Sequence, residues 1–274
     1  MTATGKKRND PPRPVAAFDL DGTFYRWSLS IQLLDEMVSR GYLPERRIEP
    51  LKGPRDEWMR RERSYTDFSN LYVKMLDEGL LRGVSARAMR AVALDVVQQY
   101  GSRVYVFTRE LSATLREHDY VLVAISGSPI EIVEVFCEQW GFDHFLGTRE
   151  EVGADGFYTG NRAAADLPVF RKEQEFRRFI HEYGNHPASV AVGDTFGDAA
   201  MLKAARYPIA FNPDPELMRE AIAKGHGVVE ERKNKAVCTR RLAGARLHRF
   251  LPPPVADRLT ERLLAAGVTP FPER

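Results

Sequence analysis

The sequence reads Val-Ala-Ala-Phe-Asp-Leu-Asp-Gly-Thr from Val15 to Thr23, and this stretch decides the fold. A short apolar run that ends in a turn signal is typical of a buried strand in a parallel sheet. Its polar residues then lie at the carboxyl end of the strand, where open α/β sheets bind ligands. Asp19 and Asp21 share a face of a continuing strand, and two carboxylates so close repel unless a cation lies between them. The stretch therefore predicts a site that holds a hard cation against an anionic substrate.

An Asp-x-Asp-Gly sequence also occurs in ordinary turns and at the start of calcium-binding loops. With Asp19 as the first position of such a loop, Phe24 would replace the required glycine and Ser30 the closing glutamate. A calcium loop is therefore excluded, and the choice between a turn and a catalytic site depends on the sequence downstream.

The composition limits the class of protein. Of the 274 residues, 43% are hydrophobic and 28% charged, and the net charge is +2, which is ordinary for a globular protein and suggests no nucleic-acid partner. Two cysteines, Cys137 and Cys238, are too few for a disulfide framework and fit a reducing, cytoplasmic location. No apolar run approaches the roughly 18 residues of a membrane span. Residues 1–14 lack the apolar core of a secretory signal and are expected to be a disordered lead-in.

Apolar periodicity predicts an α/β protein with an all-helical insert after the first strand. Residues 26–102 contain helical patterns at 28–40, around 68–79 and at 85–100, without a convincing strand. The core then comprises residues 15–25 and 103–230, where strands alternate with helices as in a doubly wound, Rossmann-like parallel sheet. Its expected later strands are 121–125, 142–146, 188–192, 208–211 and an edge strand at Val228-Val229; its helices are 110–118, 130–140, 171–183, 198–205 and 214–224, with a hairpin at 155–160.

Three of these strands end in polar clusters, which a parallel sheet brings to one edge. The clusters are Asp19 with Asp21, Ser126 with Gly127, and Asp194 with Asp198, while Lys172 opens a helix between the last two. Carboxylates for a metal, a lysine, and a serine at a helix start together suit phosphoryl transfer. Taken singly, Ser126 is explained as an N-cap, Lys172 as a solvated helix residue, and Asp194 and Asp198 as a turn and an N-cap. Their order and their positions at element ends favour the joint interpretation.

These motifs, in this order, resemble those of the haloacid dehalogenase superfamily of phosphatases, over roughly residues 15–230, and the helical insert resembles the phosphoserine phosphatase-like branch. The resemblance implies a nucleophile at Asp19 and a general acid and base at Asp21. It implies that Ser126, Gly127 and Lys172 bind the phosphoryl group. It also implies a Mg²⁺ site made by Asp19, the backbone carbonyl of Asp21 and Asp194, with Asp198 as a ligand or close by.

The sequence departs from that branch at positions that concern the leaving group. Ser28 stands where phosphoserine phosphatases carry a glutamate for the substrate ammonium, and Gly197 stands where an asparagine is usual. No cap arginine can be assigned to a substrate carboxylate; the cap cations considered are Arg55, Arg60, Arg61 and Lys74, and carboxylates that could replace the glutamate are Asp35, Glu36 and Asp67. The entrance to the leaving-group pocket is expected at Tyr25, Arg26 and Trp27, unless these residues only pack between cap and core.

Residues 231–274 are expected to form a basic C-terminal extension, because Arg232–Arg249 holds seven basic residues and no acidic one. Leu242, Ala245, Leu247 and Phe250 form a loosely helical apolar face. Contact with an anionic membrane surface or nucleic acid is one interpretation; a solvated helix that packs on the core is the one we expect.

The sequence thus predicts a Mg²⁺-dependent phosphatase that hydrolyses a small phosphomonoester through an aspartyl-phosphate on Asp19. Two alternatives stay open: a phosphotransferase that uses the same intermediate, and a catalytically idle binding protein on the same fold. Neither the substrate nor the oligomeric state can be predicted.

Overall fold

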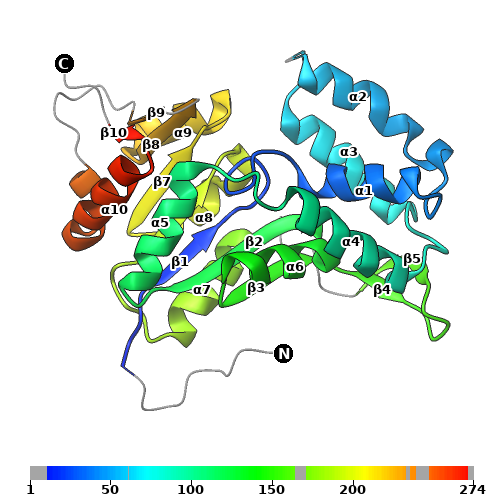
Figure 1. Cartoon of the computed structure of the whole chain (residues 1–274), viewed down its shortest axis with the longest axis horizontal. Coiled ribbons are helices and arrows are strands. Elements are labelled where there is room, and N and C mark those ends of the chain that lie inside the picture. Colours follow the sequence, from blue (N-terminus) through cyan, green and yellow to red (C-terminus); the bar gives the residue numbers. More distant parts are fainter. Residues whose placement is uncertain (1–10, 61, 164–170, 233–234, 239–246, 271–274) are drawn as a thin grey trace.

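A computed structural model describes residues 11–60, 62–163, 171–232, 235–238 and 247–270, and its centre is an eight-stranded sheet (Figure 1). Six neighbouring strands are parallel, in the order β3 (His144–Thr148), β2 (Val121–Pro129), β1 (Val15–Phe18), β6 (Val190–Gly193), β7 (Tyr207–Phe211) and β8 (Gly227–Arg232). β9 (Lys235–Cys238) pairs antiparallel with β8, and β10 (Thr269–Pro270) pairs with β9. None of the helices in these ranges has the length and apolar character needed to cross a membrane.

Helices cover both faces of the sheet, which gives one hydrophobic core on each face. Successive residues of β1 point alternately into the two cores. Val15 and Ala17 face a core formed with α7 (Lys172–Glu182), α8 (Ala199–Ala204) and α9 (Pro215–Lys224). Ala16 and Phe18 face a core formed with α5 (Val106–Glu117), α6 (Ile130–Trp140) and α10 (Pro253–Ala265). All four residues of β1 are therefore buried, and the predicted doubly wound α/β class is confirmed.

The segment between β1 and α5 is helical, and we call residues 29–100 the cap. It contains α1 (Leu29–Ser39), the short 3₁₀ helix η1 (Glu45–Arg47), α2 (Glu49–Met59), α3 (Tyr65–Asp77) and α4 (Ala86–Tyr100). In Figure 1, α1, α2 and α3, coloured blue to cyan, lie to one side of the sheet, and α4 lies beside α6. α2 was not predicted, because Leu51 is its one buried residue and a single buried residue gives no apolar period.

A hairpin of β4 (Glu150–Val152) and β5 (Tyr158–Arg162) joins the core to the cap, and its turn is the one predicted at 155–160. Backbone hydrogen bonds connect it to the loop before α4: Gly83 N donates to Tyr158 O at 2.8 Å, and Tyr158 N donates to Val84 O at 2.9 Å. The hairpin therefore attaches the cap to the core at a second place, besides the chain connections.

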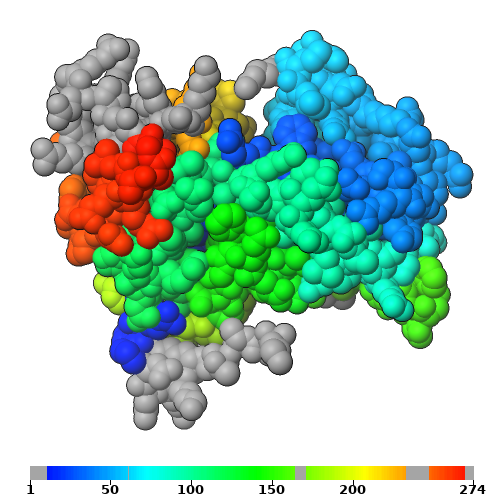
Figure 2. Space-filling model, in the orientation of Figure 1, coloured from blue at the N-terminus to red at the C-terminus, as the bar shows by residue number. Residues whose placement is uncertain are grey.

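The C-terminal region departs from the prediction. β8 is not an edge strand, since β9 pairs with its outer side. The boundary expected at residue 231 falls inside β8, and α10 packs against α5, as the contact between the red and green segments in Figure 2 shows. Leu247 lies in a 3₁₀ turn and Phe250 is buried, while Leu242 and Ala245 of the expected apolar face lie outside the described residues.

Candidate active site

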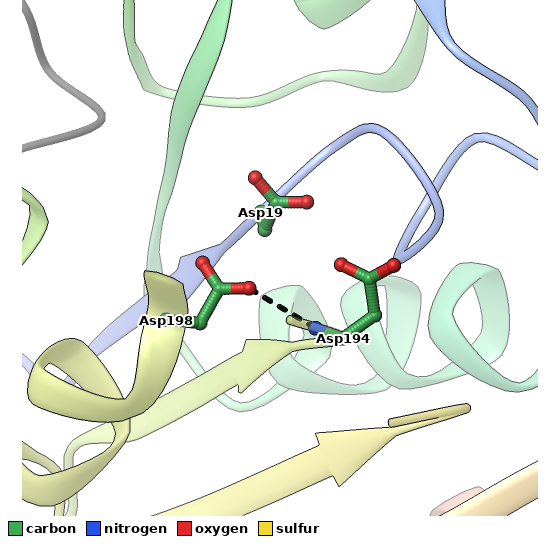
Figure 3. Close-up of side chains that lie close together, drawn as sticks. All are labelled: Asp19, Asp194 and Asp198. Carbon is green, nitrogen blue, oxygen red and sulfur yellow. Dashed lines mark hydrogen bonds between the residues drawn. The ribbon is translucent and has the colours of Figure 1, made fainter. Parts of the chain in front are cut away.

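Three carboxylates lie close together beyond the ends of two neighbouring strands (Figure 3). Asp19 follows β1, Asp194 follows β6, and β1 and β6 are paired. Asp198 ends the 3₁₀ turn η3 (Phe196–Asp198) just beyond β6. One carboxylate oxygen of each residue lies within 4.8 Å of the others. Parallel strands bring their carboxyl ends to one edge of a sheet, and these three acids meet there.

The turn after Asp19 needs a glycine. Gly22 has φ +80°, which residues with side chains rarely adopt, and a Cβ there would lie 2.1 Å from Asp194 Oδ2. Gly22 N donates to Tyr25 O, and Thr23 Oγ1 donates to Asp194 Oδ1 at 3.1 Å. The turn therefore lies directly against Asp194 and helps to hold it.

Lys172 is the cation of the site. It is buried at the start of α7, and its Nζ lies 2.5 Å from Asp19 Oδ1 and 2.6 Å from Asp198 Oδ1. Burial lowers the pKa of this ammonium, but the charges of Asp19 and Asp198 outweigh that effect, so its pKa is raised. Lys172 therefore stays protonated next to the carboxylate that the sequence predicts as nucleophile.

Asp198 is held by the backbone as well. Its Oδ2 accepts hydrogen bonds from Asp194 N and Thr195 N, each at 3.1 Å, which closes the turn after β6. Fully buried carboxylates need such donors, and these bonds hold the fully buried Asp198 in place.

Asp21 makes its hydrogen bonds outside this cluster. Its Oδ1 accepts from Leu29 N, the first residue of α1, and its Oδ2 accepts from Ser128 Oγ. Burial raises the pKa of Asp21 to about 6, although both hydrogen bonds oppose the shift. The side chain is thus not part of the three-carboxylate cluster, and the protonated form is more populated near neutral pH than for an ordinary aspartate.

The end of β2 supplies the third polar group. Ser126 is fully buried, and its Oγ accepts from Ser128 N at 3.1 Å, while Gly127 lies in the wall of the site cavity. Ser128 was missed as a site residue; the Ser-Gly-Ser sequence carried the signal, because alternate serines on an extended chain share a side. Ser128 Oγ also contacts Ser30 Oγ at 2.6 Å, which links the core to the cap.

The electrostatics of the cluster fit a divalent cation. Burial raises the pKa of Asp19 to about 7; Lys172 opposes this shift, and repulsion from Asp198 and Asp21 adds to it. Burial, followed by repulsion from Asp19 and Asp198, raises the pKa of Asp194 well above its usual range. Lys172 alone therefore does not balance the negative charge. Carboxylate oxygens are among the ligands that Mg²⁺ prefers.

Above these groups lies a cavity of about 160 Å³, bounded by the core on one side and the cap on the other. The core side consists of Asp19, Asp21, Gly127, Lys172, Asp194, Thr195 and Gly197. The cap side consists of Ser28, Ser30, Tyr65, Thr66, Phe68, Ser69, Asn70, Tyr72 and Val73. The site is therefore closed by α3 and the start of α1.

The expected entrance residues do not line this cavity. Tyr25 is buried, Trp27 stacks on Trp58 with ring centroids 5.2 Å apart, and the Arg26 guanidinium lies over the ring of Tyr105. The expectation of a substrate entrance at these three residues was wrong, and the packing alternative describes them. The bulk of Tyr25 and Trp27 is explained by aromatic packing, of Tyr25 on Phe136 and of Trp27 on Trp58.

The family of haloacid dehalogenase-like hydrolases matches residues 16–203. The chain is 26% identical over 240 residues to the inhibition of morphological differentiation protein of Streptomyces azureus, covering 82% of this chain and 81% of that protein. It is 31% identical over 144 residues to a phosphoserine phosphatase of Streptomyces coelicolor, covering 52% of this chain but 33% of that longer protein. A solved structure described as a phospho-aspartyl intermediate analogue of phosphoserine phosphatase aligns with a TM-score of 0.56 at 21% identity, over 81% of this chain and 95% of the other.

Proposed function

Since the chain belongs to the haloacid dehalogenase-like hydrolases and is a phosphatase of the phosphoserine phosphatase-like kind, we propose that it hydrolyses a small phosphomonoester through an aspartyl-phosphate on Asp19. The observation that carries this proposal is the cluster of Asp19, Asp194 and Asp198 around the buried Lys172. A binding module has no need for an ammonium held between two buried carboxylates at the floor of a cavity. Lys172 and Gly127 line the cavity and are the proposed groups that bind the phosphoryl oxygens. Ser126 is proposed with them, although its side chain is fully buried, lies outside the cavity wall and accepts from Ser128 N.

In the first step, Asp19 attacks phosphorus. One of its oxygens is held by Lys172, and the second makes no hydrogen bond to a described residue. The ester P–O bond breaks as the Asp19–phosphorus bond forms, and the leaving alkoxide takes a proton from Asp21. The pKa of Asp21, raised to about 6 by burial, suits this role, because an acid works best when its pKa lies near the working pH.

In the second step, Asp21 acts as the base. Its carboxylate takes a proton from water as the water attacks phosphorus, which releases phosphate and restores the Asp19 carboxylate. Leu29 N and Ser128 Oγ hold Asp21 in place. Since Leu29 begins α1, the cap orients the proposed acid and base as well as covering the cavity.

A Mg²⁺ ion fits the cluster and would be held by Asp19 and Asp194, with Asp198 close by. When bound, such an ion neutralises phosphoryl oxygens and so reduces their repulsion of an attacking carboxylate. The fit rests on three carboxylates, those of the buried Asp19 and Asp198 and of the half-buried Asp194, whose negative charge Lys172 does not balance.

The proposal is tested by hydrolysis of p-nitrophenyl phosphate with Mg²⁺, with EDTA, and with Ca²⁺ in place of Mg²⁺. We expect turnover with Mg²⁺, loss of turnover in EDTA and its return with excess Mg²⁺. Ca²⁺ should substitute poorly, because it accepts more ligands at longer distances. Full activity in excess EDTA would contradict the metal assignment.

A measurement that needs no turnover separates metal binding from catalysis. Mg²⁺ should raise the melting temperature of the protein, since a ligand that binds the folded state stabilises it. Asp194→Asn should weaken that response. Asp95→Asn, which changes an exposed partner of Arg40, is the matched control and should keep it.

A further inference from the structure

The cap side of the cavity carries no charge among the residues that the structure describes. Its members come from the start of α1 and from α3, and their side chains are hydroxyls, one amide, aromatic rings and one aliphatic group. The charged groups on the core side, Asp19, Asp21, Asp194 and Lys172, are those that the proposed chemistry uses. Recognition of the leaving group therefore falls to neutral side chains.

The charged residues of the cap that the sequence made candidates lie elsewhere. Arg55 pairs with Asp35 at 2.7 Å, and Arg60 pairs with Glu62 at 2.9 Å. Asp67 accepts a hydrogen bond from Ser64 Oγ at 2.8 Å, at the start of α3. These side chains are outside the cavity wall; Arg61 lies outside the described residues.

The neutral wall also has unused hydrogen-bonding capacity. Thr66, Ser69 and Asn70 line the cavity, and their side chains make no hydrogen bond to other described residues. Tyr65 lies beside Ser28; burial raises the pKa of its phenol well above the usual range, and repulsion from Asp21 adds to the shift, while a hydrogen bond with Ser28 opposes it. The wall can therefore donate to and accept from hydroxyl groups, and Tyr65 does so as a neutral phenol.

From this wall we infer that the substrate is a phosphomonoester of a small, uncharged alcohol that carries further hydroxyl groups. The inference rests on the proposed phosphatase function and concerns the same cavity. An ammonium or carboxylate on the leaving group would lose water without gaining a counter-charge, which costs free energy. A hydroxyl would exchange its hydrogen bonds to water for bonds to the cap.

The test is a series of three-carbon phosphate esters, compared by kcat/KM in one buffer with fixed Mg²⁺. The series contains glycerol 3-phosphate, n-propyl phosphate, 3-aminopropyl phosphate, 3-phosphoglycerate and L-phosphoserine, with p-nitrophenyl phosphate as the control for activity. We expect glycerol 3-phosphate to exceed each charged ester at least tenfold, and to exceed n-propyl phosphate by a smaller factor. A charged ester that equals or exceeds glycerol 3-phosphate would overturn the inference and leave the phosphatase function intact. Absence of hydrolysis for every ester, p-nitrophenyl phosphate included, would overturn the proposed function and this inference with it.

A pair of matched variants tests the wall itself. Ser28 is 2% exposed, lines the cavity and caps α1, with its Oγ accepting from Ile31 N. Ser28→Asp and Ser28→Asn are similar in shape, and both residues are good helix caps, but only the first adds a charge. Relative to Ser28→Asn, Ser28→Asp should raise the ratio of kcat/KM for 3-aminopropyl phosphate over n-propyl phosphate at least fivefold. An equal ratio in the two variants would show that this wall does not read the charge of the leaving group.

Discussion

At the scale of single residues, the site pairs two charged groups, each of which would destabilise the folded protein if it were buried alone. Asp19 is 6% exposed and Lys172 is 5% exposed, and each is a buried charge that the other partly neutralises. Removing one partner of a buried pair leaves the other uncompensated. Burying the two charged groups costs free energy. The proposed function explains why the chain nevertheless places this pair at the end of a strand.

Asp19→Asn should abolish hydrolysis of p-nitrophenyl phosphate and leave the protein folded. A neutral amide cannot attack phosphorus, while its shape and its hydrogen bond to Lys172 Nζ, through the amide oxygen, can be kept. Activity and the far-UV circular dichroism spectrum are the two measurements. A purified variant that keeps more than a small fraction of wild-type turnover would show that Asp19 is not the nucleophile.

Glu150→Gln should make the protein more stable above neutral pH. Burial raises the pKa of Glu150 from 4.5 to about 7, with the charge of Arg162 opposing, and neither carboxylate oxygen has a hydrogen-bond partner among the described residues. The folded state holds the proton of the Glu150 carboxyl more tightly than the unfolded state does. The protonated carboxyl therefore stabilises the protein at low pH, and this stabilisation is lost as pH rises towards 7. Such a shift corresponds to about 3 kcal/mol in a fully buried group, and solvent screening of the half-exposed Glu150 reduces it to about 1 kcal/mol.

Urea midpoints at pH 5 and pH 8 test this prediction. The difference between the two pH values should be smaller in Glu150→Gln than in the wild type. An unchanged difference would show that Glu150 ionises in the folded protein at its usual pKa. Glu151→Gln is the control on the neighbouring position, because Glu151 is exposed and bonds to Thr159 and Asn161.

The site residues differ in how far sequence could predict their arrangement. Asp19, Asp194 and Lys172 follow from their places at element ends, since parallel strands bring their carboxyl ends together. The two ion pairs of Lys172 cannot be predicted from the sequence, because its bonds to Asp19 and Asp198 depend on the position of α7 over the sheet. Ser128 and Ser30 meet across the joint of cap and core, and no local pattern encodes a contact between distant segments.

At the scale of elements, the sequence pattern predicted those helices that their own capping residues and apolar stripes stabilise. α1, α3 and α4 begin at the serine N-caps Ser28, Ser64 and Ser85, and each carries a periodic apolar stripe. α2 has neither feature: its N-cap Ile48 makes no side-chain bond, and aromatic stacking of Trp58 on Trp27 and Phe68 holds it in the cap. Tertiary contact rather than propensity therefore forms this helix.

Glu231→Ala should lower the free energy of unfolding by about 1–2 kcal/mol, as expected for loss of a helix N-cap. Tyr105 precedes α5 and cannot cap it; instead, the carboxylate of Glu231 from β8 accepts from Val106 N at 3.0 Å and Phe107 N at 2.7 Å. Without it, the buried Phe107 N and the half-buried Val106 N lose their partner. Urea unfolding measures the change, and Glu230→Ala, on the same strand, is the control. Equal stability of the two variants would contradict this role of Glu231.

At the scale of the whole molecule, sequence predicted the layers but not the outer part of the sheet. The six parallel strands have apolar runs or turn signals that reveal them. β10 has only Thr269 and Pro270, and β9 begins at Lys235, so their addition beyond β8 depends on pairing with distant chain and not on a local period. For the same reason, the C-terminal residues were expected as a basic extension with a solvated helix that packs on the core, and no strand was expected among them.

The structure makes α10 a part of the core, and this yields the last prediction. Val255, Leu259 and Leu263 are buried against the side of the sheet that carries α5. Arg262 pairs with Glu110 at 2.9 Å and with Glu117 at 2.7 Å, and both acids lie on α5. If α10 belongs to the core, unfolding it must expose apolar surface of the whole domain.

Leu259→Ala should therefore destabilise the entire protein by about 2–5 kcal/mol, the usual cost of removing a fully buried leucine side chain. Leu264→Ala is the matched control on the same helix: Leu264 is 58% exposed, and its removal should change the free energy of unfolding by less than about 0.5 kcal/mol. Urea unfolding followed by tryptophan fluorescence reports on Trp27 and Trp58 at the joint of cap and core and on Trp140 in α6, whereas circular dichroism reports on all helices. Both signals should shift together to lower urea in Leu259→Ala. A circular dichroism loss that precedes an unshifted fluorescence transition would show that α10 detaches by itself, as a separate extension would.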